Sequence, residues 1–101
     1  MSTGNLSIRD LADRLVAVAE QLVLAGKSQT IEELKQLELR QRELLQALSE
    51  RALSHPGELE SESRRKLQHY QRLNDQYMKE LGERYAVVHF DRSRQDISHL
   101  L

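Results

Sequence analysis

The sequence contains no cysteine and no tryptophan, and its 101 residues include one proline, one phenylalanine and four glycines. The lack of cysteine excludes a disulfide framework, thiolate metal ligands and a cysteine nucleophile. Charged residues interrupt every apolar run well before the roughly 20 residues that a membrane-spanning helix needs. The first residues also lack the basic and apolar segments of a secretory signal. We therefore expect a soluble cytoplasmic protein with no membrane insertion.

Positive and negative charges nearly cancel in this chain. Fifteen Lys and Arg residues and sixteen Asp and Glu residues give a formal net charge of -1, so no overall field attracts nucleic acid. The length suits one domain, 1–101, with one core. Apolar residues recur at helical spacing, which predicts an all-α fold: an antiparallel three-helix bundle or coiled coil with a long third helix and a short C-terminal helix.

The first helix is predicted over 8–25. Ser7 can accept a hydrogen bond from an amide of the first turn, which marks a helix start. Gly26 is expected to end the helix in the left-handed conformation. The apolar face is wide enough to contact two neighbouring helices, and it consists of Ile8, Leu11, Ala12, Leu15, Val18, Ala19, Leu22, Val23 and Ala25.

The second helix is predicted over 31–53. Thr30 and Glu33 form a capping-box pattern at its start, and Pro56 stops it because proline has no amide proton. Leucines mark an apolar stripe that Gln41 interrupts at its middle. The residues expected to face solvent are Glu38, Arg40, Arg42 and Glu43.

The third helix, predicted over 58–88, is the longest. It would extend roughly 45 Å, against about 27 Å for the first, so it must pass its neighbours or bend. Gly82 is the expected position of a bend. Tyr70, Tyr77 and Tyr85 recur on its apolar stripe; they either pack in the core or form a recognition surface, because tyrosine combines apolar area with a polar tip.

An apolar run, YAVVHF at 85–90, ends this third pattern. In a helix its side chains point in nearly every direction, so one neighbouring helix cannot cover them all. The sequence offers no second strand that could pair with the run. A further helix-start pattern predicts a short tail helix over 93–100 that folds back over it through Ile97, Leu100 and Leu101.

Residues for catalysis or metal binding are few. No two of the four histidines, His55, His69, His89 and His99, have the spacing of three or four residues that zinc ligands on a helix need. Paired carboxylates near the helix starts are explained by capping and by the helix dipole. No phosphate-binding loop or nucleophile motif is present. We expect no enzymatic activity, no cofactor and no metal.

Two segments resemble the FliT family of flagellar export chaperones, which is related in architecture to the FlgN chaperones. TIEELKQLELRQRELLQAL, at 30–48, is similar to the second helix of that family. LQHYQRLNDQYMKELGERYAVV, at 67–88, resembles its long third helix. Ile31 stands where the family often has an aromatic residue.

The resemblance implies a cytoplasmic bundle that binds a filament-cap or hook-associated subunit and delivers it to the export apparatus. It also implies a mobile C-terminal helix that covers the client site. A client helix would bind a groove on the third helix, and the tail would compete with it. The groove residues are Leu73, Tyr77, Leu81, Tyr85 and Val88, and the tail residues are Ile97, Leu100 and Leu101.

Two alternatives use the same apolar stripe. The chain can be a structural coiled-coil protein that forms a homodimer through the third helix. It can also be a regulator that sequesters a transcription factor. Both stay open at the level of the sequence.

Overall fold

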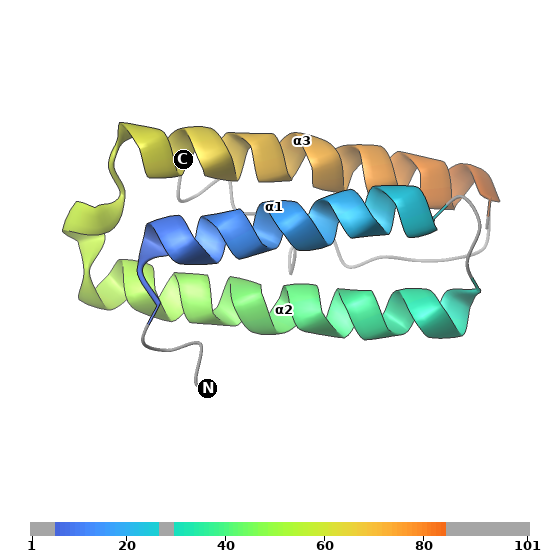
Figure 1. Cartoon of the computed structure of the whole chain (residues 1–101), viewed down its shortest axis with the longest axis horizontal. Helices are drawn as coiled ribbons and strands as arrows, with labels where there is room; N and C mark the ends of the chain where they lie inside the picture. The colour runs from blue at the N-terminus through green and yellow to red at the C-terminus, as the bar shows by residue number, and fades with distance from the viewer. Residues whose placement is uncertain (1–5, 27–29, 85–101) are drawn as a thin grey trace.

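Three long helices form the part of the chain that the computed structural model describes (Figure 1). The described residues are 6–26 and 30–84, with the backbone alone at 31 and 81–84. In chain order the elements are α1 (Ile8–Ala25), α2 (Ile31–Ser54), the short 3-10 helix η2 (Pro56–Glu58) and α3 (Ser61–Arg84). These ranges contain no strand, so the prediction of an all-helical fold is confirmed.

Side-chain caps place the starts of the first two helices. The Ser7 hydroxyl accepts a hydrogen bond from the Asp10 amide at 3.2 Å, and the Thr30 hydroxyl accepts one from the Glu33 amide at 3.4 Å. Such caps satisfy amides that have no partner inside the helix. α1 has its predicted bounds, and α2 ends one residue later than predicted.

The third helix starts at Ser61, not at residue 58 as predicted. The three residues of η2 form a separate turn, in which the Leu59 amide donates to the Pro56 carbonyl at 3.1 Å. Proline suits the first position of a helical turn because an amide there would have no partner. The prediction therefore merged two elements into one.

The far end of α3 continues through Gly82 to Arg84, so the described helix does not stop at the glycine. The predicted helical residues 85–88 and the predicted tail helix over 93–100 lie outside the described residues.

Gly26 ends α1 with φ -59° and ψ -19°, which is a right-handed conformation. The left-handed conformation predicted for it is therefore wrong. The amide of Gly26 donates to the Leu22 carbonyl at 2.8 Å, as in a continuing helix. A Cβ atom at this position would lie 3.3 Å from a ring carbon of Tyr77. Glycine is explained here by the close approach of α3 to the end of α1.

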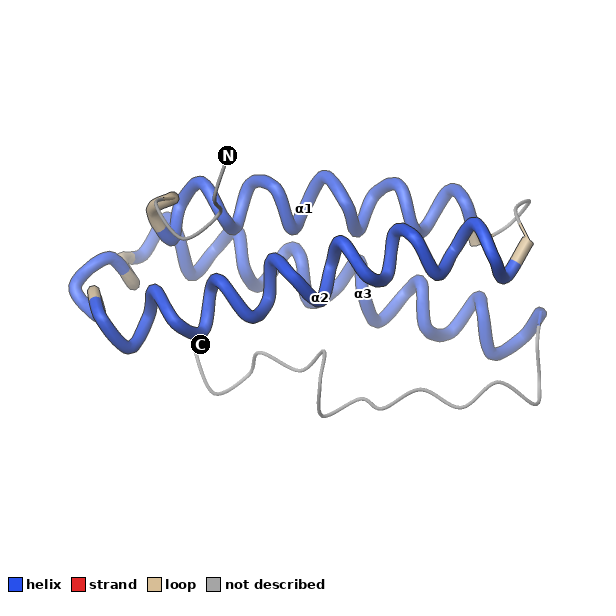
Figure 2. The backbone as a smooth tube through the Cα atoms, turned by 90° about the horizontal axis from the view of Figure 1, so that it is seen from below, coloured by secondary structure: helices blue, strands red, loops and turns tan. Residues whose placement is uncertain are grey.

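α1 packs against both other helices, as the width of its apolar face predicts. It lies between α2 and α3 in Figure 1, and Figure 2 shows the three helices from a second side. Its buried face is apolar throughout and includes the small residues Ala12 and Ala19, which let a neighbouring backbone approach closely. The backbones of α2 and α3 approach α1 more closely than they approach each other.

Candidate functional site

The predicted groove residues lie on the second half of α3 and after it. Leu73 is half-buried against the core, whereas Tyr77 is completely buried. Leu81 belongs to α3, but its side chain is outside the described part, and so are Tyr85 and Val88 as a whole. The predicted tail residues Ile97, Leu100 and Leu101 are also outside it.

Tyr77 joins all three helices. Its ring lies against Gly26 at the end of α1, and its hydroxyl donates a hydrogen bond to Glu38 Oε1 of α2 at 2.8 Å. Burial raises the pKa of the Tyr77 hydroxyl, and the contact with Glu38 raises it further. The hydroxyl is therefore a neutral donor at physiological pH.

Glu38 is half-buried, although the sequence predicts that it faces solvent. Burial raises the pKa of its carboxyl group, while the hydrogen bond from Tyr77 and the charges of Arg42 and Lys35 lower it. Burial is the largest of these effects. The folded state consequently disfavours the charged form of Glu38 relative to an exposed carboxylate.

Three buried polar residues, Gln41, Tyr70 and Asn74, connect α2 to α3, and we call them the polar layer. Gln41 Nε2 donates to the Tyr70 hydroxyl at 2.7 Å and to Asn74 Oδ1 at 2.8 Å. The exposed fractions of the three residues are 1%, 0% and 3%. Gln41 Oε1 is buried and has no hydrogen-bond partner among the described residues. Because a buried unpaired acceptor is unfavourable, this contact is weaker than apolar packing of the same area.

The interruption of the α2 stripe at Gln41 is the sequence signal for the polar layer. The stripe locates Gln41, but not its partners, which follow it by 29 and 33 residues and lie on another helix. Tyr70, which could have been a core or a surface residue, is completely buried. Burial raises the pKa of its hydroxyl, which therefore stays protonated.

α3 extends past the end of α1 (Figure 1). Tyr77 lies against Gly26, the residue at which α1 ends, and α3 continues from there to Arg84. These last residues, 78–84, add about 10 Å of helix at 1.5 Å per residue. The prediction that the third helix passes a neighbour is confirmed for α1, since the far end of α3 reaches past it.

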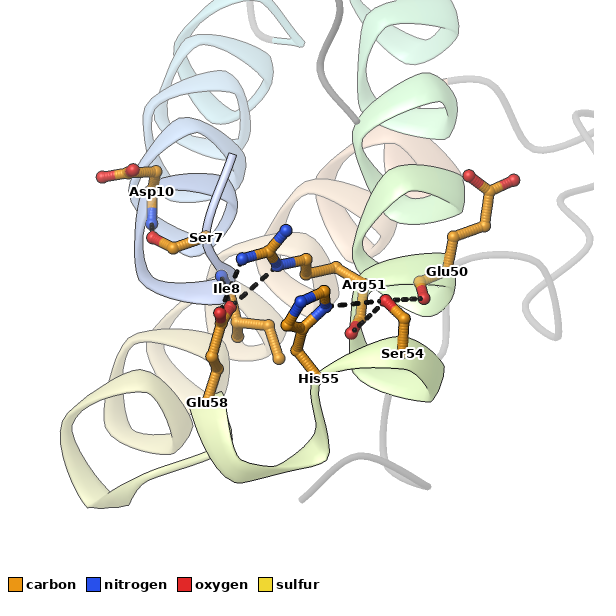
Figure 3. Close-up of polar contacts among 8 residues, drawn as sticks. All are labelled: Ser7, Ile8, Asp10, Glu50, Arg51, Ser54, His55 and Glu58. Atoms are coloured by element: carbon orange, nitrogen blue, oxygen red, sulfur yellow. Dashed lines mark hydrogen bonds and ion pairs between the residues drawn. The ribbon is translucent and has the colours of Figure 1, made fainter. Parts of the chain in front are cut away.

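The opposite end of the bundle is held by Glu58, Arg51 and Ile8, which we call the charged clamp (Figure 3). Arg51 donates to Glu58 Oε1 through Nε at 3.0 Å and to Oε2 through Nη2 at 2.7 Å. The Ile8 amide donates to Oε1 at 3.1 Å. The hydrogen bonds from Arg51, and then that from Ile8, lower the pKa of Glu58 to about 2. The clamp joins the start of α1, the end of α2 and η2.

Ion pairs also connect α1 to the start of α3. Arg9 contacts Glu62 and lies 3.9 Å from Glu60, and Lys66 Nζ lies 2.6 Å from Asp13 Oδ1. Each exposed pair contributes little to stability by itself. The described ion pairs that join one element to another are these and the pair in the charged clamp. All of them lie in the same half of the bundle.

The described ranges contain no group of three His, Asp or Glu residues that could hold a metal ion. Ser54 Oγ lies 2.8 Å from His55 Nδ1, but both residues are exposed, and the hydroxyl also donates to the Glu50 and Arg51 carbonyls at the end of α2 (Figure 3). Such contacts cap a helix end. Within residues 6–26 and 30–84, no helix has the length and apolar character of a membrane span.

Comparison of the chain with protein-family models, with curated proteins and with solved structures gave no match in any of the three.

Proposed function

We propose that the protein is a non-enzymatic chaperone or adaptor of the flagellar export type, which binds a filament-cap or hook-associated subunit in the cytoplasm. In this proposal the three helices form an antiparallel bundle, and a tail helix over 93–100 covers the client site. The charged clamp supports the antiparallel order, because it brings the start of α1 to the end of α2. The contact of Tyr77 with Gly26 supports it at the other end.

The extension of α3 past Gly26 is the observation that carries the proposal. The far end of α3 has no α1 beside it, and the apolar run 85–90 follows directly in the sequence. An apolar helical segment with too few neighbours favours contact with another amphipathic helix. A client helix and the tail of the same chain would compete for this contact through the residues predicted for each.

Deletion of residues 91–101 tests the competition. Removing the tail should raise the affinity for synthetic C-terminal segments of filament-cap and hook-associated subunits. In the proposal the tail covers the site for part of the time, and a protein binds its ligand more weakly when its binding-competent state is only partly populated. Fluorescence anisotropy with labelled segments measures the two dissociation constants. Equal or weaker binding by the shortened chain contradicts the role of the tail as a cover.

The involvement of α3 is tested by Leu73→Ser, since Leu73 is the half-buried member of the predicted groove. The matched control is Leu53→Ser on α2, where the side chain is 86% exposed. Leu73→Ser should weaken segment binding by about tenfold or more, and the control should leave it unchanged. Unfolding curves of both variants show whether a loss of binding comes from a loss of folding.

The mass of the protein in dilute solution discriminates the main alternative. A monomer that binds the segments supports the chaperone. A stable dimer that binds none of them favours a structural homodimeric coiled coil.

A further inference from the structure

Tyr77 is a predicted groove residue, but it is buried, so a change of conformation is needed before a partner can contact it. Its ring lies against Gly26 at the end of α1, its hydroxyl is bonded to Glu38 of α2, and the residue is completely buried. Separation of the second half of α3 from α2 would release this hydroxyl from Glu38. The composition of the contacts along α3 shows where such a separation is easiest.

The two sides of α3 are held by different chemistry. The α1 side is apolar: every buried residue of α1 is Ile, Leu, Val or Ala. The α2 side contains the polar layer, with an acceptor, Gln41 Oε1, that is buried without a partner among the residues described. A satisfied hydrogen bond adds little net stability because water replaces it on separation, and the unpaired acceptor regains its hydration. Separation of α2 from α3 is thus cheaper than separation of either from α1.

The two halves of α3 also differ. Its first half is connected to α1 by Lys66–Asp13 and Arg9–Glu62, next to the charged clamp. Its second half begins at the polar layer and runs past the end of α1. Weak contact with α2 and fewer neighbours therefore coincide in the same segment.

We propose that the polar layer is a conformational device that makes the contact between α2 and the second half of α3 separable, so that this half opens while the charged end stays closed. In this state Tyr77 and Leu73 become available as a binding surface. Replacement of the layer by apolar side chains keeps the fold and removes the opening. Its use for a client rests on the proposed chaperone function, but the opening itself is a property of the free protein.

Native-state hydrogen exchange of the full-length protein tests the opening without any client, because a short helical segment that loses its packing also unfolds and exposes its amides. We expect the amides at 70–80 of α3 and at 34–41 of α2 to exchange with one common opening rate and one common urea dependence, faster than the amides at 63–69 and 44–52. A gradual increase toward the helix ends indicates ordinary fraying and overturns the proposal. So does uniform exchange along α3 through global unfolding.

The triple variant Gln41→Leu/Tyr70→Phe/Asn74→Leu assigns the opening to the polar layer. Replacing all members by apolar groups of similar shape leaves no member without a partner, and we expect exchange at 70–80 to slow roughly tenfold or more, which approaches the rate of the first half. The matched control is Gln46→Leu on the exposed face of α2, which should change neither half.

The single variant Gln41→Leu, which keeps Tyr70 and Asn74, tests whether exchange at 70–80 becomes faster when the polar layer is only partly replaced. It leaves the Tyr70 hydroxyl without its Gln41 partner, so exchange at 70–80 should become faster. Slower exchange in the single variant, or unchanged exchange in the triple variant, overturns the proposal. Failure of segment binding with the expected exchange pattern contradicts the chaperone function alone.

Discussion

Gly26 occupies a position where a backbone preference and a packing requirement act against each other. Its right-handed φ and ψ values are open to alanine, and alanine would restrict the unfolded chain. Yet a Cβ atom would lie 3.3 Å and 3.4 Å from two ring carbons of Tyr77 and 3.1 Å from the Leu22 carbonyl oxygen. The Tyr77 ring cannot move away freely, since its hydroxyl is bonded to Glu38.

We predict that Gly26→Ala destabilises the protein by about 1 kcal/mol, because crowding of the Tyr77 ring outweighs the gain from a restricted unfolded chain. Urea unfolding followed by circular dichroism measures the change. The matched control is Gly57→Ala, where a Cβ atom meets nothing within 4 Å. This control should be neutral or stabilising by about 0.4–1 kcal/mol.

The reason for the Gly26 effect is tested in a second background. In the Tyr77→Ala variant the ring is absent, so Gly26→Ala should become neutral or stabilising. A substitution that destabilises both backgrounds equally shows that Tyr77 is not the cause. In that case the crowding comes from the backbone of α1, where the Leu22 carbonyl oxygen lies 3.1 Å from the added Cβ atom.

The starts of the three helices differ in how far they are determined by the local sequence. The caps at Ser7 and Thr30 were predicted correctly because a cap, its amide partner and the first turn lie within four residues. The start of α3 was predicted three residues too early. The Glu58 carboxylate belongs to the charged clamp, and its amide partner, Ile8, lies 50 residues away. No local pattern contains a contact of that range.

The two caps differ in geometry, and we predict that they differ in strength. Ser7→Ala should destabilise α1 by about 1 kcal/mol, since it removes the partner of the Asp10 amide. Thr30→Ala should have a smaller effect, because its hydrogen bond is 3.4 Å long against 3.2 Å. Urea unfolding of the two variants makes the comparison, and a larger loss for Thr30→Ala contradicts it.

The candidate site was predictable in outline only. Helical periodicity places Leu73 and Tyr77 on one face of α3, but the depth of burial depends on where α1 ends. Because Tyr77 meets Gly26, it is enclosed, and α3 is left without α1 only after that point. Likewise, Gln41 is visible as a break in a stripe, whereas its bonds to Tyr70 and Asn74 depend on the packing of two helices.

The two ends of the bundle carry carboxylates with opposite pKa shifts. Glu58 in the charged clamp has a pKa lowered from 4.5 to about 2 by hydrogen bonds from Arg51 and Ile8. Its contribution to stability is present above pH 4.5 and is lost as the pH falls toward 2. Glu38, at the Tyr77 end, has a pKa raised above 4.5 by burial. Its contribution is present below pH 4.5 and is lost as the pH rises through the raised value.

Neutral amides at these positions should therefore act in opposite directions. Glu58→Gln is predicted to lower the urea midpoint at pH 7 and to reduce the loss of stability between pH 4.5 and 2, because the variant has no carboxylate to protonate. Glu38→Gln is predicted to raise the midpoint at pH 7, since an amide oxygen can still accept the Tyr77 hydroxyl without the unfavourable burial of a charge. Below pH 4.5 this gain should shrink.

Unfolding midpoints of the wild type and both variants at pH 2.5, 4.5 and 7 test these signs as differences, so that the other carboxylates cancel. The double variant should show the sum of the two effects, because the residues lie at opposite ends and share no partner. A destabilising Glu38→Gln at pH 7 would show that the ionised carboxylate holds the Tyr77 end together. The second half of α3 would then be fastened by charge as the first half is, and it would not be the end of the bundle that opens.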